Sequence, residues 1–235
     1  MGSFAQEIAD KYQLTREDMD AFAIESLTRA KNAIDDGSLK DETVAVTVKS
    51  RKGETIVTDD EQPHNAKIDK IPTLRPAFKE DGTVTAANSS SISDGGSALI
   101  LASEAAVKEK GLKPMARIVA HTTNSRHPSE FTIAPIGAIE KLLEKTGWSK
   151  DDVDLFEINE AFAMVTILAT RELGLDPEKV NIHGGACAQG HPVGSTGSRI
   201  IVSLMYALKK LGKKRGIASL CIGGGEATAV AIEMV

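Results

Sequence analysis

The second half of the chain alternates short apolar runs with helical patterns, and this alternation limits the folds that it can adopt. Strands are expected at Ser97–Leu101, Ala116–His121, Leu155–Ile158, Val180–His183, Gly216–Ile222 and Thr228–Met234. Helices are expected at Ser103–Lys110, Ile136–Lys145, Glu160–Leu173 and Thr196–Leu211. The last two strands are joined by Gly223-Gly224-Gly225, which predicts a terminal hairpin. This order predicts an α/β protein with a mixed β-sheet covered by helices.

Residues 1–92 follow a different pattern, which predicts a separate α+β unit. Two helices are expected first, and the second begins at a variant capping box formed by Thr15 and Asp18. Asp36-Gly37 is a typical end for that helix. The strands expected at 44–48 and 55–58 are joined by a turn at Lys52-Gly53. The polar segment 59–92 is expected to be largely loop.

The composition excludes several classes of protein. Of 235 residues, 41% are hydrophobic and 26% charged, as in an ordinary globular protein. The net charge of −5 predicts no nucleic-acid partner, and no apolar run approaches the ~18 residues of a membrane span. The sequence starts without the basic and apolar regions of a signal peptide. Cys187 and Cys221 are the only cysteines, so we expect no disulfide, no metal site and a reducing compartment.

Residues 184–197 crowd five glycines and a proline around His191, directly before an expected helix. Glycine costs stability wherever backbone must be ordered, so this density indicates tight turns or close approach to a ligand. A histidine held there is a candidate for acid–base or oxyanion chemistry. A purely structural histidine is the alternative. A phosphate-binding loop is disfavoured, because the G-K-[ST] ending is absent and the dinucleotide-binding spacing does not fit.

Three expected strand ends carry polar or reactive residues. Asn159 follows the strand at 155–158, His191 follows the strand at 180–183, and Cys221 closes the strand at 216–222. Functional groups gather at strand ends in layered α/β folds, so these three side chains can meet if the strands share one sheet. Each also has a structural explanation: Asn159 as a helix cap, His191 as an ordered histidine, and Cys221 as a small buried side chain.

Three segments together resemble the C-terminal motifs of the thiolases. They are Asn159-Glu160-Ala161-Phe162-Ala163, Gly190–Gly197 and Cys221-Ile222-Gly223-Gly224-Gly225, in the family's order and near its spacing. Phe78, residues 82–86 and residues 88–96 look like the family's coenzyme A-binding loop region. Within the family, the chain looks nearest to acetyl-CoA acetyltransferases. The resemblance implies the layered thiolase fold and a Claisen condensation of two acetyl-CoA molecules to acetoacetyl-CoA and coenzyme A, with the reverse thiolysis.

The resemblance also implies a role for each residue of the site. His191 would activate a nucleophilic cysteine and help to bind a thioester oxygen, as a thiol needs a nearby base to become a thiolate. Cys221 would carry the proton at the acetyl α-carbon. Asn159 would hold a water that completes an oxyanion hole with His191, and Gly223 would donate its backbone N–H to a second one.

Substrate contacts follow from the same resemblance. Ser90, with Ser89 and Ala86 nearby, would contact the pantetheine arm of coenzyme A. The tunnel for the acyl chain and pantetheine would be lined by Phe78, Phe131 and Phe162. Many relatives carry another bulky apolar residue at the position of Phe131, which leaves the acyl-chain length open. Coenzyme A and acetyl-CoA are expected as substrates, with no permanently bound cofactor.

The resemblance divides the chain into three parts. Residues 1–92 would form a loop domain for coenzyme A binding and oligomerisation, 93–113 the last strand and helix of an N-terminal domain, and 114–235 the C-terminal domain. The nucleophilic cysteine belongs to the family's N-terminal half, which is expected to be missing here. Cys187 is not expected to replace it, because it lies in the same loop as His191. We therefore expect the isolated chain to be inactive without that half.

The wider expectations are a homo-oligomer, dimeric or tetrameric, that works in fatty-acid and ketone-body metabolism. Its location would be the cytoplasm, or the mitochondrial or peroxisomal matrix in a eukaryote. Two alternatives stay open at this point. One is a degradative 3-ketoacyl-CoA thiolase, and the other is a non-catalytic subunit that binds acyl-CoA or serves assembly.

Overall fold

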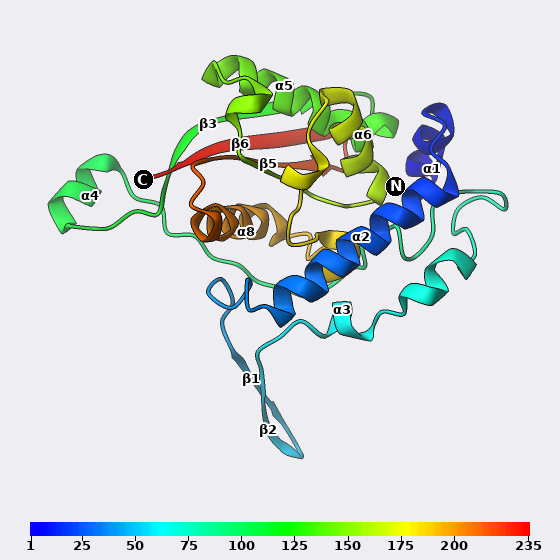
Figure 1. Ribbon diagram of the computed structural model, residues 1–235, viewed down its shortest axis with the longest axis horizontal. Coiled ribbons are helices and arrows are strands. Elements are labelled where there is room, and N and C mark those ends of the chain that lie inside the picture. The colour runs from blue at the N-terminus through cyan, green and yellow to red at the C-terminus, as the bar shows by residue number, and fades with distance from the viewer.

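A four-stranded mixed sheet lies at the centre of the computed structural model, which describes residues 1–235 (Figure 1). The strands are β3 (Ala116–Ser125), β4 (Leu155–Ile158), β5 (Arg215–Ile222) and β6 (Glu226–Met234), in the spatial order β3-β6-β5-β4. β4 pairs with β5 in parallel, while the β3–β6 and β5–β6 pairs are antiparallel. The mixed sheet and the terminal hairpin predicted from the sequence are confirmed.

Helices cover both faces of this sheet (Figure 1). α5 (Ala134–Thr146) and α6 (Ala163–Leu173) pack on one face, and α8 (Thr196–Leu211) packs on the other. Side chains of a strand alternate between faces, so Phe156 joins the cluster under α5 and α6 while Leu155 joins the cluster under α8. All four residues of β4 are buried for this reason.

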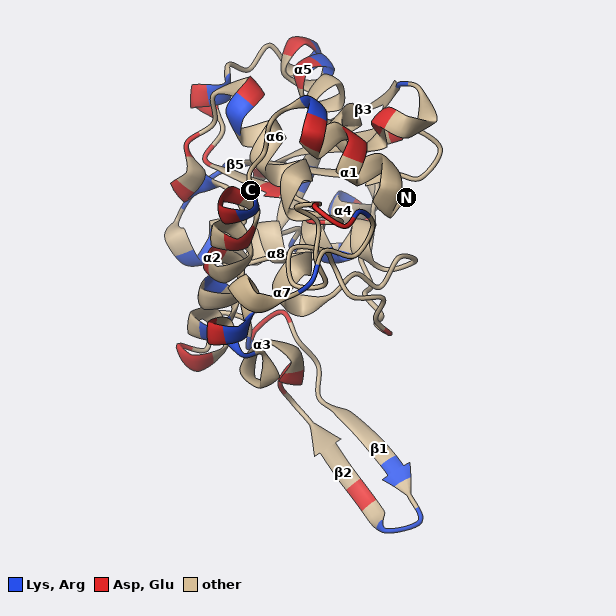
Figure 2. Cartoon of the chain, turned by 90° about the vertical axis from the view of Figure 1, so that its right-hand side faces the viewer, with Lys and Arg blue, Asp and Glu red and all other residues tan.

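The N-terminal part packs beside the sheet through α1 (Gly2–Lys11) and α2 (Arg16–Asp35). The predicted capping box begins α2: Asp18 N–H donates to Thr15 Oγ1 at 3.1 Å, and Thr15 N–H donates to Asp18 Oδ2 at 3.2 Å. The hairpin of β1 (Val46–Ser50) and β2 (Gly53–Val57) projects away from the body, and all its residues are exposed (Figure 2). No helix of the structure has the length and apolarity needed to cross a membrane.

Several short helices complete the chain. They are α3 (Glu61–Asn65), η1 (Ile68–Thr73), α4 (Glu104–Lys110), η2 (Pro128–Ile133), η3 (Lys150–Asp152), η4 (Pro177–Lys179) and α7 (Ala186–Gln189). α3 and η1 lie in the segment predicted to be loop. α4 has the predicted ends, with Ser103 as its N-cap and Gly111 in the left-handed conformation. The helix expected from Glu160 begins only at Ala163, and β3 runs on to Ser125.

The strand predicted at Ser97–Leu101 is absent, which corrects the sequence prediction. These residues have no strand partner, and the side chains of Ile100 and Leu101 are 96% and 74% exposed. A short apolar run forms a strand only where a neighbour completes its hydrogen bonds and buries a face. No such neighbour lies beside this segment in the 235-residue chain.

The strand predicted at Val180–His183 is also absent. Only Val180 forms a bridge, with Phe156, and the backbone then turns away because Asn181 has a left-handed φ of +48°. The Asn181 side chain takes over the hydrogen bonds of a strand. Its Oδ1 accepts from Ile158 N–H and its Nδ2 donates to Ile158 O, both at 2.8 Å. An amide can mimic a peptide group in this way, and asparagine tolerates the left-handed region better than most residues.

Candidate active site

Asn159 and Cys221 lie at the same end of the parallel pair β4–β5. Asn159 directly follows β4, and its N–H donates to Ser219 O on β5 at 2.9 Å. Cys221 lies two residues further along β5. The carboxyl ends of parallel strands are where ligands bind in α/β sheets. The structure therefore brings Asn159 and Cys221, two of the three predicted residues, to the same end of the sheet.

The Asn159 side chain is buried without a partner. It is 2% exposed, and neither its Nδ2 nor its Oδ1 forms a hydrogen bond with another protein group. The alternative role as a simple helix cap is not observed, because α6 begins after Phe162. A buried amide with no protein partner is costly, and such groups collect at sites that bind water or a ligand. The unpaired amide supports a functional role for Asn159, which stays a prediction.

His191 is held by a loop that crosses a serine-rich segment. Its N–H donates to Ser91 O at 2.9 Å, and it forms a parallel bridge with Ile92. Gly190 has a φ of +82°, and a Cβ at this position would overlap the side chain of Ser93. Only glycine satisfies both the turn and this close approach. The glycines around His191 therefore fix the position of its backbone.

The imidazole orientation is set by Thr196, a residue that sequence reasoning treated only as the start of a helix. Thr196 Oγ1 donates its single proton to Pro192 O at 3.0 Å, and it lies 2.6 Å from His191 Nδ1. With its proton on Pro192 O, the hydroxyl accepts from Nδ1–H, and in this arrangement Nε2 is the unprotonated nitrogen. Burial, with a contribution from Arg199, lowers the pKa of His191. His191 is thus a neutral base whose Nε2 is free to accept a proton.

The two cysteines are protonated thiols at neutral pH. Burial raises the pKa of Cys221 to about 12. Burial also raises the pKa of Cys187 well above its usual value, and the charge of Glu160 adds to this. An activated cysteine needs a lowered pKa, so neither side chain has the environment of a nucleophile. Cys221 fits the carrier of a proton better than a thiolate.

Glu160 organises the loops behind these residues. It is completely buried and accepts from Ser26 Oγ at 2.7 Å, Asn181 Nδ2 at 2.8 Å and Cys187 N–H at 3.0 Å. Burial raises its pKa. These contacts join α2 to the loop before α7 and to α7 itself, so Glu160 supports the site without facing a ligand. Sequence reasoning missed this role, because its partners are distant in the chain.

The predicted coenzyme A-binding serines lie between the two motifs. Ser90 donates to Ala161 O through both its N–H, at 3.1 Å, and its Oγ, at 3.0 Å. Ser89 forms an antiparallel bridge with Phe162, and Ala86 is exposed nearby in the chain. The segment 88–92 therefore connects the loop after β4 to the loop of His191. Contact of these residues with coenzyme A stays a prediction.

The remaining predicted residues are more widely placed. Phe131 is fully buried and packs edge-on against Phe162, with ring centroids 6.2 Å apart. Phe78 is 47% exposed, and its ring covers Gly2 at the start of α1. Gly223 lies exposed in the turn between β5 and β6, where its N–H forms no hydrogen bond with the protein. No group of three or more His, Cys, Asp or Glu side chains could hold a metal ion.

The fold is a layered α/β fold, and the chain belongs to the thiolase family. The family model described as "Thiolase, C-terminal domain" matches residues 112–234, and that described as "Thiolase, N-terminal domain" matches residues 1–105. The N-terminal model thus includes the segment predicted to be a loop domain. The three-part division of the chain stays a prediction.

Individual relatives agree with this assignment. The acetyl-CoA acetyltransferase of Syntrophomonas wolfei is 46% identical over 99% of this chain and 59% of its own length. The crystal structure of the Bacillus anthracis acetyl-CoA acetyltransferase superposes with a TM-score of 0.97 at 46% identity, covering 100% of this chain and 60% of that one. The Acat5 thiolase from Ascaris suum, solved in complex with coenzyme A, has a TM-score of 0.90 at 39% identity, covering 100% of this chain and 60% of that one. The chain spans about three fifths of these relatives.

Proposed function

We propose that the chain forms part of an acetyl-CoA C-acetyltransferase and carries the base and proton-carrier half of the site. The observation that carries this proposal is the contact of Thr196 with His191 Nδ1, which leaves Nε2 free to accept a proton. His191 belongs to the same set of sequence motifs as Asn159 and Cys221. The names of the relatives at 46% identity support the acetyl-CoA chemistry. The coenzyme A complex of the Ascaris suum thiolase supports a thioester substrate.

The first half of the reaction is acyl transfer to a cysteine thiol that this chain does not supply. His191 Nε2 accepts the thiol proton, the thiolate attacks the acyl carbonyl carbon, and the bond to the coenzyme A sulfur breaks. The leaving thiolate takes its proton from the Cys221 thiol to become coenzyme A, which leaves Cys221 as a thiolate for the second half. A hydrogen-bond donor from His191 and a water held by Asn159 stabilise the charge that develops on a thioester oxygen.

The second half moves a proton at carbon, and Cys221 suits it. In thiolysis the enolate of the departing acetyl-CoA must gain a proton at its α-carbon, and Cys221, whose pKa is about 12, holds a proton to give. In condensation the same transfer runs backwards, so the Cys221 thiolate removes the α-proton. The resulting enolate attacks the acetyl carbon on the nucleophilic cysteine, the carbon–sulfur bond breaks, and the departing thiolate takes back the proton held on His191 Nε2. The unpaired N–H of Gly223 donates to the oxygen on which negative charge gathers.

The test is reconstitution of acetoacetyl-CoA thiolysis. We expect no turnover from the 235-residue chain alone, and turnover when the N-terminal two fifths of the Bacillus anthracis enzyme are supplied separately. His191→Ala should abolish the restored activity and Cys187→Ser should leave it unchanged. Robust turnover by the lone chain that disappears in Cys187→Ser would show that the nucleophile is here after all.

The same assay distinguishes the alternatives. Faster cleavage of longer 3-ketoacyl-CoA substrates than of acetoacetyl-CoA would favour a degradative 3-ketoacyl-CoA thiolase. Coenzyme A binding by calorimetry without any turnover in the reconstituted mixture would favour a non-catalytic acyl-CoA-binding or assembly subunit. We further propose that the assembled protein is a homodimer or homotetramer in the cytoplasm or in an organelle matrix. Sedimentation of the reconstituted protein tests the oligomeric state.

A further inference from the structure

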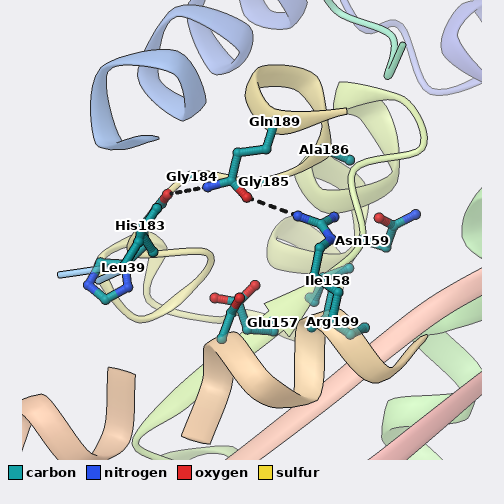
Figure 3. A pocket seen from close by; sticks show the side chains of 12 residues that line it. Leu39, Glu157, Ile158, Asn159, His183, Gly184, Gly185, Ala186, Gln189 and Arg199 are labelled. Carbon is teal, nitrogen blue, oxygen red and sulfur yellow. Dashed lines mark hydrogen bonds between the residues drawn. The ribbon is translucent and has the colours of Figure 1, made fainter. Parts of the chain in front are cut away.

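A buried polar cavity lies beside Asn159. It is lined by Leu39, Glu157, Ile158, Asn159, His183, Gly184, Gly185, Ala186, Gln189, Arg199, Ile200 and Ser203 (Figure 3). The residues come from the segment after α2, from the end of β4, from the loop before α7, from α7 itself and from the first half of α8. Its free space is about that of a single water molecule. None of the roles derived above uses Glu157 or Arg199.

The unpartnered buried polar atoms of the chain gather at this cavity. Of six such side-chain atoms, four belong to the lining residues Asn159, His183 and Arg199. A fifth is Oε2 of Glu42, whose Oε1 accepts from the lining residue Ser203 at 2.9 Å. Folded proteins leave few buried polar atoms unpaired, so this concentration indicates a bound species that completes their hydrogen bonds.

The mixture of groups identifies that species as water. The guanidinium of Arg199 disfavours a cation, and the free space, about that of one water, leaves no room for a polyatomic anion. The free atoms include donors, Arg199 Nε–H and Asn159 Nδ2–H, and an acceptor, Asn159 Oδ1. The Glu157 carboxyl, in a residue that is 5% exposed, also lines the cavity. Water donates and accepts equally well, and a buried water typically makes about three hydrogen bonds.

The orientation of the Asn159 amide decides what this water would do. Figure 3 shows the Asn159 oxygen on the side of Arg199 and its nitrogen on the far side. Arg199 is itself fixed, because its Nη1 donates to Gln189 Oε1 at 2.9 Å and Gln189 Nε2 donates to His183 O at 3.1 Å. The fixed cation therefore faces the acceptor end of the amide.

We propose that Arg199 is a positioning residue that orients Asn159 through an ordered water bound in this cavity. The water accepts from Arg199 Nε–H and donates to Asn159 Oδ1 and to the Glu157 carboxyl. The amide is then held with Nδ2 directed out of the cavity, where an oxyanion needs a donor rather than an acceptor. The importance of that donor for catalysis rests on the proposed function, whereas the water site does not.

A high-resolution crystal structure of the 235-residue chain tests the water site. We expect a well-ordered water within hydrogen-bond distance of both Arg199 Nε and Asn159 Oδ1. In Arg199→Met the water should be lost, and the Asn159 amide should refine as a mixture of both orientations. A wild-type cavity without that water would overturn the proposal, and this result needs no variant to fold.

Kinetics of the reconstituted enzyme test the positioning role. Arg199→Met should lower kcat roughly 10- to 100-fold, less than the ~10²–10³-fold loss on removing an oxyanion donor outright, with KM unchanged. Arg199→Lys should recover part of kcat. Arg29→Met is the control, since Arg29 is a largely buried arginine that pairs with Glu25 and Glu178 and does not line the cavity. Its kcat should equal the wild type.

The crystal structures and the kinetics together distinguish failure of this proposal from failure of the proposed function. An Arg199→Met enzyme with wild-type kcat and an unchanged Asn159 amide would contradict the positioning role while leaving the thiolase chemistry intact. If the wild-type mixture shows no thiolysis, the proposed function fails, and the crystal structures still decide whether Arg199 and a water orient Asn159.

Discussion

At the scale of single residues, the chemistry depends on which atoms carry protons. His191 can act as a base only if Nε2 is the unprotonated nitrogen, and one hydroxyl proton determines this. Thr196 gives that proton to Pro192 O and must therefore accept from His191 Nδ1. Burial keeps the histidine neutral by lowering its pKa. A base, its tautomer and its orientation are thus set within six consecutive residues.

Replacing Thr196 with valine tests this arrangement. Valine keeps the shape but removes the acceptor, so the imidazole loses the bond that selects its tautomer. We expect kcat/KM of the reconstituted enzyme to fall about 10²-fold, within the ~10²–10⁴ range of general acid–base catalysis. Thr196→Ser keeps the hydroxyl and should stay within a few-fold of the wild type. Equal activity of the valine and serine variants would contradict the tautomer argument.

At the scale of elements, Asn181 replaces a missing strand. Its side chain satisfies both backbone groups of Ile158 and also donates to Glu160 Oε1 at 2.8 Å. One amide therefore closes the open edge of β4 and anchors the buried carboxyl group that organises the loops. Any substitution here leaves several buried polar groups without partners.

Asn181→Ala should lower the free energy of unfolding by about 3 kcal/mol or more. Each buried group left unpaired costs roughly 1–3 kcal/mol, and the left-handed backbone is less favourable for alanine than for asparagine. Urea unfolding followed by circular dichroism measures the change. Asn32→Ala, at an exposed position of α2, serves as the control and should change stability by less than about 0.5 kcal/mol. A loss below 1 kcal/mol in Asn181→Ala would contradict the role of the amide.

Elements with strong local signals were predictable from the sequence, and the others were not. The bounds of β4 and α8 are those predicted. A short, largely apolar run and a long amphipathic repeat can both be recognised from consecutive residues. The apolar run at 97–101 gave no information about a partner strand. In the run at 180–183, the pattern did not reveal the turn at Asn181. The candidates Asn159, His191 and Cys221 came from motifs, whereas the roles of Thr196, Glu160 and Arg199 depend on contacts that spacing does not reveal.

At the scale of the whole molecule, buried ionisable groups join the N-terminal part to the sheet domain. Glu42 follows α2 in the chain and accepts from Ser203 on α8 at 2.9 Å. Burial raises the pKa of Glu42 to about 7, although the bond from Ser203 and the charge of Arg199 oppose this. The exposed β1–β2 hairpin has no comparable contact with the body (Figure 2). The two parts are therefore coupled by a contact that responds to pH.

The pH dependence of stability follows from that pKa. A carboxyl group with a pKa of about 7 in the folded state and 4.5 in the unfolded state binds its proton more tightly when folded. Its contribution is most favourable below pH 4.5 and declines as the pH rises to about 7. Glu42→Gln removes this dependence, so at pH 8 the variant should be more stable than the wild type by at most about 3 kcal/mol, whereas at pH 4.5 the gain should nearly vanish. Urea unfolding at both pH values measures the difference. Glu109→Gln, at an exposed position, is the control. A stability difference between Glu42→Gln and the wild type that is the same at both pH values would contradict the raised pKa of Glu42.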